Sequence, residues 1–380
     1  MRIDTACVHG FKDKSNSTGS VSVPIFQSAT FAHPGVNQST GYDYSRLQNP
    51  TREALENTIA ALENGTDALA FSSGMAAISA LMELFKIGDH IIASEDLYGG
   101  SIRLFNNISH KNGLDIDFVN TSDITSIKSK ITKDTRAVFV ETPTNPMMHV
   151  TDVAAVKNII KDQDILLIVD NTFLTPYFQQ PLSLGADIVM HSGTKYLGGH
   201  NDTLAGFLVT SNNKLAERLR FIYKTTGACI SPFDSFLVIR GIKTLAIRME
   251  KGQSNAITLA NWLLSHEKVT AVHYVGLDSH PDIEISKKQA SGFGSMISFE
   301  VDHQETARQI LEKVELVMFA ESLGGTETLI TYPMLQTHAD VPQEERESRG
   351  IHERLLRISV GIENIDDIIN DLKYAMEGEL

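Results

Sequence analysis

The chain is poor in cysteine. Its 380 residues include only two cysteines, Cys7 and Cys229, and neither lies in a CxxC or Cys/His pattern. Two cysteines cannot form a disulfide framework, and their spacing predicts no metal site. The chain also lacks an apolar N-terminal segment and any run near the roughly 18 apolar residues that span a bilayer. We therefore expect a cytoplasmic protein with no metal site and no membrane partner.

Basic residues are also in the minority. The chain has 33 Lys and Arg against 47 Asp and Glu, which gives a formal net charge of -14. Nucleic-acid binding depends on clustered Lys and Arg, so we expect no nucleic-acid partner. Neither GxGxxG nor GxxxxGK[ST] occurs, which leaves nucleotide phosphates without an obvious cradle. Small molecules are the partners that remain.

The pattern along the chain predicts three parts. Glycines and prolines interrupt residues 1–48, which we expect to form an irregular arm. Helical and strand patterns alternate over 49–245, the predicted large domain, whereas residues 246–380 mix strands and amphipathic helices as in a smaller α+β domain. The predicted helices lie at 51–63, 74–85 and about 234–266, and the predicted strands at 90–95, 137–142, 165–172, 186–193, 269–275 and 295–301.

The four strands predicted before residue 194 are apolar on both faces. Such strands are typical of a parallel sheet that helices cover on each side, so the large domain is predicted to be an α/β doubly wound core. A final helix is expected after Asn364, an N-cap followed by Asp366 and Asp367, whose charges complement the helix dipole.

Lys195 in HSGTK follows the apolar strand 186–193. Burial at the end of such a strand can remove the charge of a lysine, and a neutral amine attacks an aldehyde to form an imine. Ser192 and Thr194 flank it with hydroxyl groups suited to a phosphate. An isolated tetrapeptide of this kind is more often a solvated loop lysine, so Lys195 alone carries little weight.

Asp170 ends another apolar strand, and its carboxylate could keep the nitrogen of a pyridine ring protonated. The alternative is an ordinary aspartate that caps a turn. Residues 72–79 begin a helix, where the N–H groups of Gly74 and Met75 could bind a phosphate; a plain N-capped helix is the other interpretation. Together with Lys195, these features favour a cofactor site.

Two further side chains could complete such a site. Tyr98 in DLYGG could stack on the cofactor ring, since the glycines after it permit close backbone approach. A surface tyrosine is equally compatible with the local sequence. Arg357, in a β-like run, could bind a substrate carboxylate through both guanidinium nitrogens, or it could be a surface arginine on a strand.

The whole chain resembles the trans-sulfuration family, the pyridoxal 5'-phosphate (PLP) enzymes of Cys/Met metabolism. The resemblance is carried by YDYSRLQNPTR, FSSGMAAI, DLYGG, ETPTNP, VDNTF, HSGTKYLGGH, FDSFLVIRGIKTL, ESLGGTETL, THADVP and LLRISVGIE, in this order. It implies PLP fold type I (aminotransferase-like), with a mainly parallel seven-stranded sheet in the large domain, and homotetramers built from dimers that share active sites.

The resemblance also implies a role for each candidate residue. By this resemblance, Lys195 is the Schiff-base lysine and proton shuttle, and Asp170 is the partner of the pyridine nitrogen. Tyr98 stacks on the cofactor ring and is, with Lys195, a catalytic residue. The residues expected to hold the phosphate of the cofactor are Gly74, Met75, Ser192 and Thr194. Tyr44 and Arg46 of the arm are expected to bind the phosphate in a neighbouring subunit. The residues expected to bind the substrate are Asn145, Ser322, Arg357 and Glu327.

Four positions depart from the family pattern. One is Leu47, where many relatives have a small residue or an arginine, and this leaves recognition of the distal group of the substrate open. Gly193 replaces a common alanine, which we expect to be harmless, and Thr328 replaces a serine and is expected to touch the substrate pocket. Gly100 stands where methionine γ-lyases have a reactive cysteine, which argues against that member.

The resemblance leaves the exact reaction open. Glu327 and residues 233–235 are most similar to the cystathionine γ-synthase branch, so γ-replacement or γ-elimination on O-acylhomoserine or cystathionine is our first hypothesis, and β-elimination of cystathionine is the second. An ordinary aminotransferase is disfavoured by the DYSR and ESLGG motifs. A non-catalytic regulator with an aminotransferase-like fold is also disfavoured, because the chain keeps Lys195 and has no added basic segment that could bind DNA.

Overall fold

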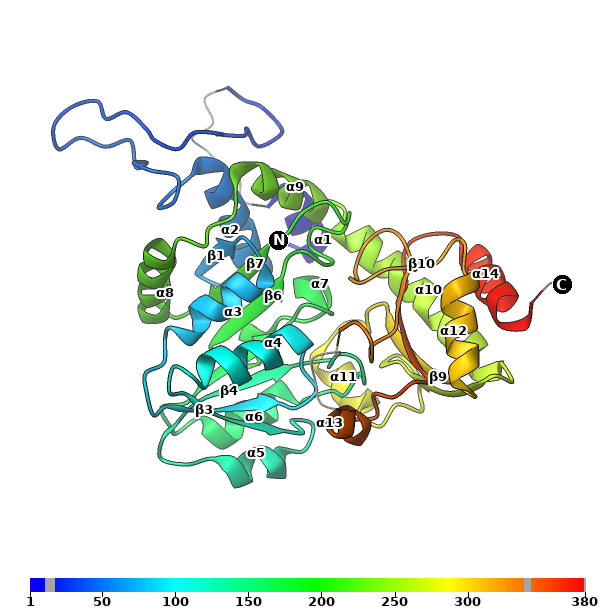
Figure 1. Ribbon diagram of the computed structural model, residues 1–380. Coiled ribbons are helices and arrows are strands. Elements are labelled where there is room, and N and C mark those ends of the chain that lie inside the picture. Colours follow the sequence, from blue (N-terminus) through cyan, green and yellow to red (C-terminus); the bar gives the residue numbers. More distant parts are fainter. Residues whose placement is uncertain (11–17, 338–342, 379–380) are drawn as a thin grey trace.

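The computed structural model describes residues 1–10, 18–337 and 343–378, and it contains two β-sheets with helices packed against them (Figure 1). The larger sheet has seven strands in the order β1-β7-β6-β5-β4-β2-β3. Its strands are β1 (Asp67–Phe71), β2 (His90–Ser94), β3 (Asp115–Val119), β4 (Thr135–Glu141), β5 (Leu166–Asp170), β6 (Ile188–Ser192) and β7 (Gly206–Thr210). The predicted seven-stranded sheet is confirmed.

The larger sheet is mainly parallel. Strands β3, β2, β4, β5 and β6 pair in parallel, and β7 runs antiparallel to both of its neighbours, β6 and β1. The parallel strands therefore end at one edge, where β4 ends at Glu141, β5 at Asp170 and β6 at Ser192. Ligands of open α/β sheets bind at this edge.

Both faces of the larger sheet are buried, as the apolar strands predict. Val140 and Val169 belong to one hydrophobic cluster, whereas Phe139 and Ile168, one residue earlier on the same strands, belong to the other. The first cluster includes residues of α1 (Ile3–His9), α2 (Pro50–Leu62), α5 (Ile124–Lys130), α6 (Val153–Ile160), α7 (Thr175–Phe178) and α9 (Pro232–Ile242). The second includes residues of α3 (Gly74–Met82), α4 (Gly99–Leu104), the π-helical turn Phe105–Ser109 and α8 (Asn213–Thr226).

The smaller sheet has its own core and the strand order β10-β11-β12-β9-β8. Its strands are β8 (Val269–His273), β9 (Met296–Val301), β10 (Met318–Phe319), β11 (Leu329–Thr331) and β12 (Leu355–Ser359), all antiparallel pairs except β10 with β11. Helices α10 (Leu245–Ser265), α12 (Gln304–Lys313) and α14 (Ile365–Glu377) supply much of this core, and the remaining helices are the 3-10 turn Pro181–Leu184, α11 (Ile283–Gln289) and α13 (Gln343–Ser348).

Helix α10 joins the two cores. Leu245 and Met249 near its start lie in a core of the larger sheet, whereas Leu259 and Leu263 near its end lie in the core of the smaller one. The division into domains at residues 245 and 246 stays a prediction. Helix α14 begins as predicted, because the side chain of Asn364 accepts the N–H of Asp366.

The structure corrects three predictions about the elements. Residues 3–9 of the predicted arm form α1, whose Cys7 is buried in the core. Of the described residues of the arm, 18–48 are irregular and extend from the body (Figure 1). The predicted helix 234–266 is two helices that part at residues 243–244, and the helix predicted to residue 85 ends at Met82. The sequence patterns also missed β1, β3 and β7 of the larger sheet.

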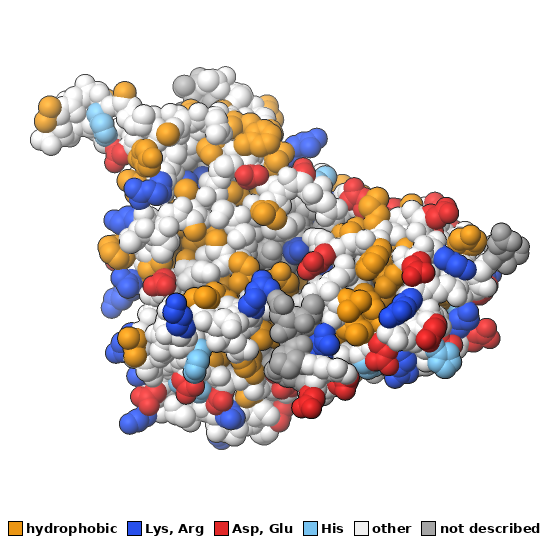
Figure 2. Space-filling view, viewed as in Figure 1, with side chains coloured by type: hydrophobic (Ala, Val, Ile, Leu, Met, Phe, Trp, Pro, Cys, Tyr) orange, Lys and Arg blue, Asp and Glu red, His pale blue; other side chains and the backbone are white. Residues whose placement is uncertain are grey.

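No helix within the described residues is long and apolar enough to cross a membrane. On the face shown in Figure 2, acidic and basic side chains are interspersed.

Candidate active site

A cavity of about 210 Å³ lies at the edge where β4, β5 and β6 end, beside the first turn of α3. Most of the candidate residues meet there. The lining includes Gly74, Met75, Tyr98, Asn145, Asp170, Ser192, Thr194 and Lys195. The fold therefore brings together, in one cavity, residues that the sequence spreads over more than 120 positions.

Lys195 lies in the turn that follows β6, and its Nζ donates a hydrogen bond to Oγ of Ser322 at 2.9 Å. Burial, together with the positive charge of Arg357, lowers the pKa of Lys195 to about 8. At pH 7 a larger fraction of this side chain is therefore the neutral amine than in an exposed lysine. A solvated loop lysine does not fit this environment.

Asp170 places a buried carboxyl group in the cavity wall. Its Oδ1 accepts hydrogen bonds from the backbone N–H of Thr172 at 3.0 Å and from the Thr172 hydroxyl at 2.5 Å. The same hydroxyl accepts the N–H of Ser192 at 2.9 Å, which links the ends of β5 and β6. Asp170 therefore caps a turn, as one interpretation of the sequence expected, and it also lines the cavity; its role opposite a pyridine nitrogen stays a prediction.

The first turn of α3 forms one wall of the cavity. Ser73 is the N-cap, and its side chain accepts the N–H of Ala76, so the N–H groups of Gly74 and Met75 have no partner within the helix. A Cβ at Gly74 would lie 3.1 Å from Cβ of Ser192, so glycine permits this close approach. These groups form a concave, N–H-lined wall of the kind that holds a phosphate.

The hydroxyl groups beside Lys195 differ in how they are used. Thr194 Oγ1 accepts the N–H of Ala205 at 3.1 Å and lies 3.3 Å from the Ala205 carbonyl oxygen. Its position is therefore fixed by the loop before β7. Ser192 contributes its backbone N–H to Thr172, and its side chain lines the cavity near Gly74.

Tyr98 is 39% exposed and lies at the mouth of the cavity. A Cβ at Gly100 would lie 2.4 Å from Cε1 of Tyr98 and 3.1 Å from Sδ of Met75, so the ring packs over this glycine. The backbone N–H of Tyr98 donates to Oε2 of Glu141 at 3.0 Å. Burial also raises the pKa of the Tyr98 phenol.

Arg357 is fully buried on β12 and is not a surface arginine. Its Nη1 donates to Oδ1 of Asn145 at 2.8 Å, and its Nη2 donates to the Ser322 carbonyl at 3.0 Å. Its Nε has no partner among the described residues. Burial lowers the pKa of Arg357 to about 10. Arg357 therefore contacts both of the other residues predicted to bind a carboxylate, Asn145 and Ser322.

Five predicted site residues are absent from the cavity lining. Ser322 and Arg357 contact lining residues, Lys195 and Asn145 respectively, whereas Glu327, Tyr44 and Arg46 have other partners. Oε2 of Glu327 accepts a hydrogen bond from Asn201 at 2.8 Å. Tyr44 is 45% exposed in the arm, and Arg46 donates to the Lys224 carbonyl, near the end of α8, at 2.5 Å. None of the three reaches Lys195 within this chain.

Thr328 was expected to touch the substrate pocket, but it is absent from the cavity lining. The residue is fully buried, and its hydroxyl donates to Glu363 Oε2 at 2.8 Å. The stretch THADVP lies outside the described residues except for Thr337.

The sequence patterns missed Glu141 and Thr172, both of which line the cavity. Glu141 is the next-to-last residue of the predicted strand 137–142, and Thr172 follows Asp170 by two residues, a spacing typical of an Asx turn. These signals are local and common, so they did not distinguish either residue.

A buried polar cluster on the opposite face of the larger sheet was also missed. Oε1 of Glu63 lies 2.6 Å from Nε2 of His191 and accepts the side-chain N–H of Asn171 at 3.0 Å. Gln179 donates in turn to Oδ1 of Asn171. Since Asn171 follows Asp170 and His191 precedes Ser192, the cluster ties together the ends of β5 and β6.

Comparisons with known proteins agree with this geometry. Residues 4–377 match the family model described as Cys/Met metabolism PLP-dependent enzyme. The chain is 48% identical to cystathionine β-lyase of Lactococcus lactis subsp. cremoris, over 99% of each chain. It is 49% identical to cystathionine γ-synthase/O-acetylhomoserine (thiol)-lyase of Bacillus subtilis, over 94% of this chain and 92% of that protein. The crystal structure of cystathionine γ-lyase from Lactobacillus plantarum complexed with L-serine superposes with a TM-score of 0.96 and 42% identity, over 99% of this chain and 98% of that one.

Proposed function

Because this chain belongs to the PLP-dependent enzymes of Cys/Met metabolism, we propose that it makes or breaks a C–S bond at the γ-carbon of O-acylhomoserine or cystathionine. The observation that carries the proposal is the half-buried amine of Lys195, with its pKa lowered to about 8, in the same cavity as the buried carboxyl of Asp170.

The residues that line the cavity fit PLP. Asp170 would face the ring nitrogen, Tyr98 would cover the ring, and Lys195 would hold the aldehyde carbon. The phosphate would lie against the N–H groups of Gly74 and Met75, beside Ser192 and Thr194. When bound, PLP supplies an aldehyde that takes the amino group of the substrate and a ring that accepts negative charge from its α-carbon.

The residues of the chain move the protons. Arg357 and Asn145 orient the α-carboxylate of the substrate, with the hydroxyl of Ser322 beside them. Lys195, as a neutral amine, removes the proton from the α-carbon. Chemistry at the γ-carbon requires a second proton to leave the β-carbon, and the flexible four-carbon stem of Lys195 can serve both positions.

β-Elimination of cystathionine is the second candidate. It is supported by the 48% identity to a cystathionine β-lyase, and it needs only the first deprotonation before the sulfur leaves the β-carbon. Glu327 supports the γ reaction by its similarity to the γ-synthase branch, and we propose that it contacts the distal part of the substrate from its place beside Asn201.

Product analysis tests the reaction. The holoenzyme receives cystathionine alone, then O-acetylhomoserine with cysteine, and mass spectrometry identifies the products. Net formation of cystathionine indicates γ-replacement, and 2-oxobutyrate with cysteine indicates γ-elimination. Pyruvate with homocysteine would support the second candidate instead. Retention of the PLP absorbance band in Lys195→Ala, or no product from either mixture, would contradict the proposal.

We further propose a cytoplasmic homotetramer in which the arm serves a neighbouring active site. The free thiols of Cys7 and Cys229 suit a reducing compartment, and the extended arm places Tyr44 and Arg46 away from the cavity of their own chain. Complementation tests the shared site. A mixture of inactive Lys195→Ala and Arg46→Ala chains, unfolded and refolded together, should regain activity that neither has alone; no recovery in mixed oligomers would contradict the arrangement.

A further inference from the structure

Two buried carboxyl groups lie side by side in the cavity wall. Glu141 ends β4 and Asp170 ends β5, and the two residues are register partners on these parallel strands. Register partners point to the same face of a sheet, and neighbouring strands are about 5 Å apart. Glu141 is 6% exposed and Asp170 is 7% exposed, so water screens neither carboxyl group well.

Such a pair does not ionise as two independent acids. Each negative charge disfavours the other, and burial disfavours both, so the pair gives up its protons in separate steps. The other charged or titratable groups that face Glu141 are Asp96, whose charge acts in the same direction, Tyr98, and the guanidinium of Arg357, which opposes it. One acid of the pair therefore keeps its proton at a pH at which isolated carboxyl groups have lost theirs.

Hydrogen-bond donors decide which acid this is. Asp170 accepts both the hydroxyl and the N–H of Thr172. Glu141 accepts only backbone donors, the N–H of Tyr98 and a weaker contact from Asn145. A carboxylate with more donors is the more stable anion.

We propose that Glu141 holds a proton on its carboxyl group at neutral pH and thereby leaves Asp170 as the single anion of the pair. The inference rests on the proposed function in one respect, the role of Asp170 opposite the PLP nitrogen. Burial, and then the neighbouring charge of Asp170, raise the pKa of Glu141 well above its usual range, in agreement with this assignment.

Glu141 is then a positioning residue with two effects. Its neutral carboxyl adds no second negative charge beside the ring nitrogen, and its carbonyl oxygen accepts the N–H of Tyr98 at 3.0 Å, which fixes the loop that carries the ring. Glutamine can reproduce both effects, because it is nearly isosteric with a protonated glutamate and always neutral. Alanine reproduces only the first.

Infrared spectroscopy of the holoenzyme tests the proton directly. A protonated carboxyl band should be present at neutral pH, should shift when only glutamate carboxyl carbons are labelled with ¹³C, and should vanish in Glu141→Gln. Glu95→Gln, the same change at a half-buried residue near the end of β2, is the matched control and should keep the band. Isotope labelling of the unsubstituted protein keeps the test valid if the variant does not fold. No label-sensitive band at neutral pH would overturn the proposal.

Cofactor affinity gives the second readout. Glu141→Ala should weaken PLP binding by about tenfold through the lost hydrogen bond, and Glu141→Gln should restore most of that loss. Asp170→Asn, the same carboxyl-to-amide change on the neighbouring strand, should weaken binding by about 100-fold, because it removes a buried charge from its partner. If Gln is as damaging as Ala, Glu141 acts as an anion and the proposal is wrong. Neither readout depends on turnover, so an enzyme that fails the product analysis would still test it.

Discussion

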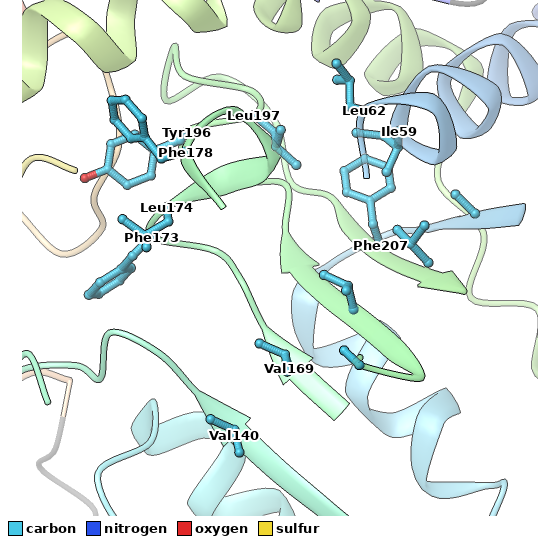
Figure 3. Packing of buried hydrophobic residues seen from close by; sticks show 14 of the residues in the cluster. Ile59, Leu62, Val140, Val169, Phe173, Leu174, Phe178, Tyr196, Leu197 and Phe207 are labelled. Carbon is cyan, nitrogen blue, oxygen red and sulfur yellow. The ribbon is translucent and has the colours of Figure 1, made fainter. Parts of the chain in front are cut away.

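Gly193 offers a sharp test of how the loop of Lys195 is packed. It lies between Ser192 and Thr194, and we expected its exchange with alanine to be harmless. The structure shows otherwise: a Cβ at this position would lie 2.3 Å from Cε2 of Phe207 and 2.9 Å from Cβ of Ala205. Phe207 is fully buried, and Figure 3 shows its ring beside Ile59 of α2, so it has no free space into which to turn.

The size of the effect follows from these distances. Carbon atoms in contact prefer separations of about 3.5–4.0 Å, so the ring or the loop must move by more than about 1 Å. Overpacking of this kind costs about 1–3 kcal/mol. The backbone of Gly193 has no positive φ, so without the contact Gly193→Ala would stabilise the protein by about 0.4–1 kcal/mol through the unfolded state. The sign of the change therefore reports the contact with Phe207.

Equilibrium denaturation of Gly193→Ala, Phe207→Leu and the double variant measures this contact. Gly193→Ala should lower the free energy of unfolding, and the same change in the Phe207→Leu background should be neutral or stabilising, with a coupling of about 1–3 kcal/mol. PLP absorbance should decrease with stability in the single variant, because the displaced loop carries Lys195. A stabilising effect of Gly193→Ala alone, or additivity within about 0.5 kcal/mol, would refute the reasoning.

Three further predictions concern the wider site. Ser322→Ala removes the 2.9 Å partner of Lys195 and should lower kcat by about two- to tenfold with little change in KM, as steady-state kinetics can measure. Glu63→Ala leaves His191 without its buried partner and should cost about 3–5 kcal/mol in denaturation experiments, with Glu63→Gln less damaging. The rate at which the PLP-free protein attaches PLP should rise with pH and level off above about 8, as Lys195 loses its proton; stopped-flow absorbance should show this midpoint move upward in Arg357→Gln, because a neighbouring positive charge is removed. A midpoint in the ordinary lysine range would contradict the burial of Lys195.

Sequence patterns predicted the parts of the fold that depend on long apolar runs. Strands β5 and β6 were predicted from residues 165–172 and 186–193 because both of their faces are buried. Strands β1 and β7 have the same length as β5 and β6, but they were missed because alanine in β1 and glycine in β7 weaken the local strand signal. The short helix α1 was missed for a similar reason: its stability comes from burying Cys7 against other helices, and this contact has no local signal.

The same distinction applies to the site. Lys195 and Asp170 were predictable because each follows a recognisable strand, and motifs of the family include both. Glu141 ends an equally recognisable strand, yet its role depends on its register with Asp170, which residue order does not give. The clash between residue 193 and Phe207 depends likewise on the antiparallel pairing of β6 and β7.

The alternation of side chains along β5 and β6 explains how one edge of the sheet can be both reactive and rigid. Asp170 points into the cavity, and the next residue, Asn171, points to the opposite face, where Glu63 binds it together with His191. The end of each strand therefore has one residue that lines the cavity, Asp170 or Ser192, and one neighbour that binds the buried polar cluster on the opposite face, Asn171 or His191. Loss of this cluster would let the two strand ends move apart, and Thr172, which bridges Asp170 and Ser192, would lose its geometry first. The buried pair on the far face thus contributes to the site without touching the cavity.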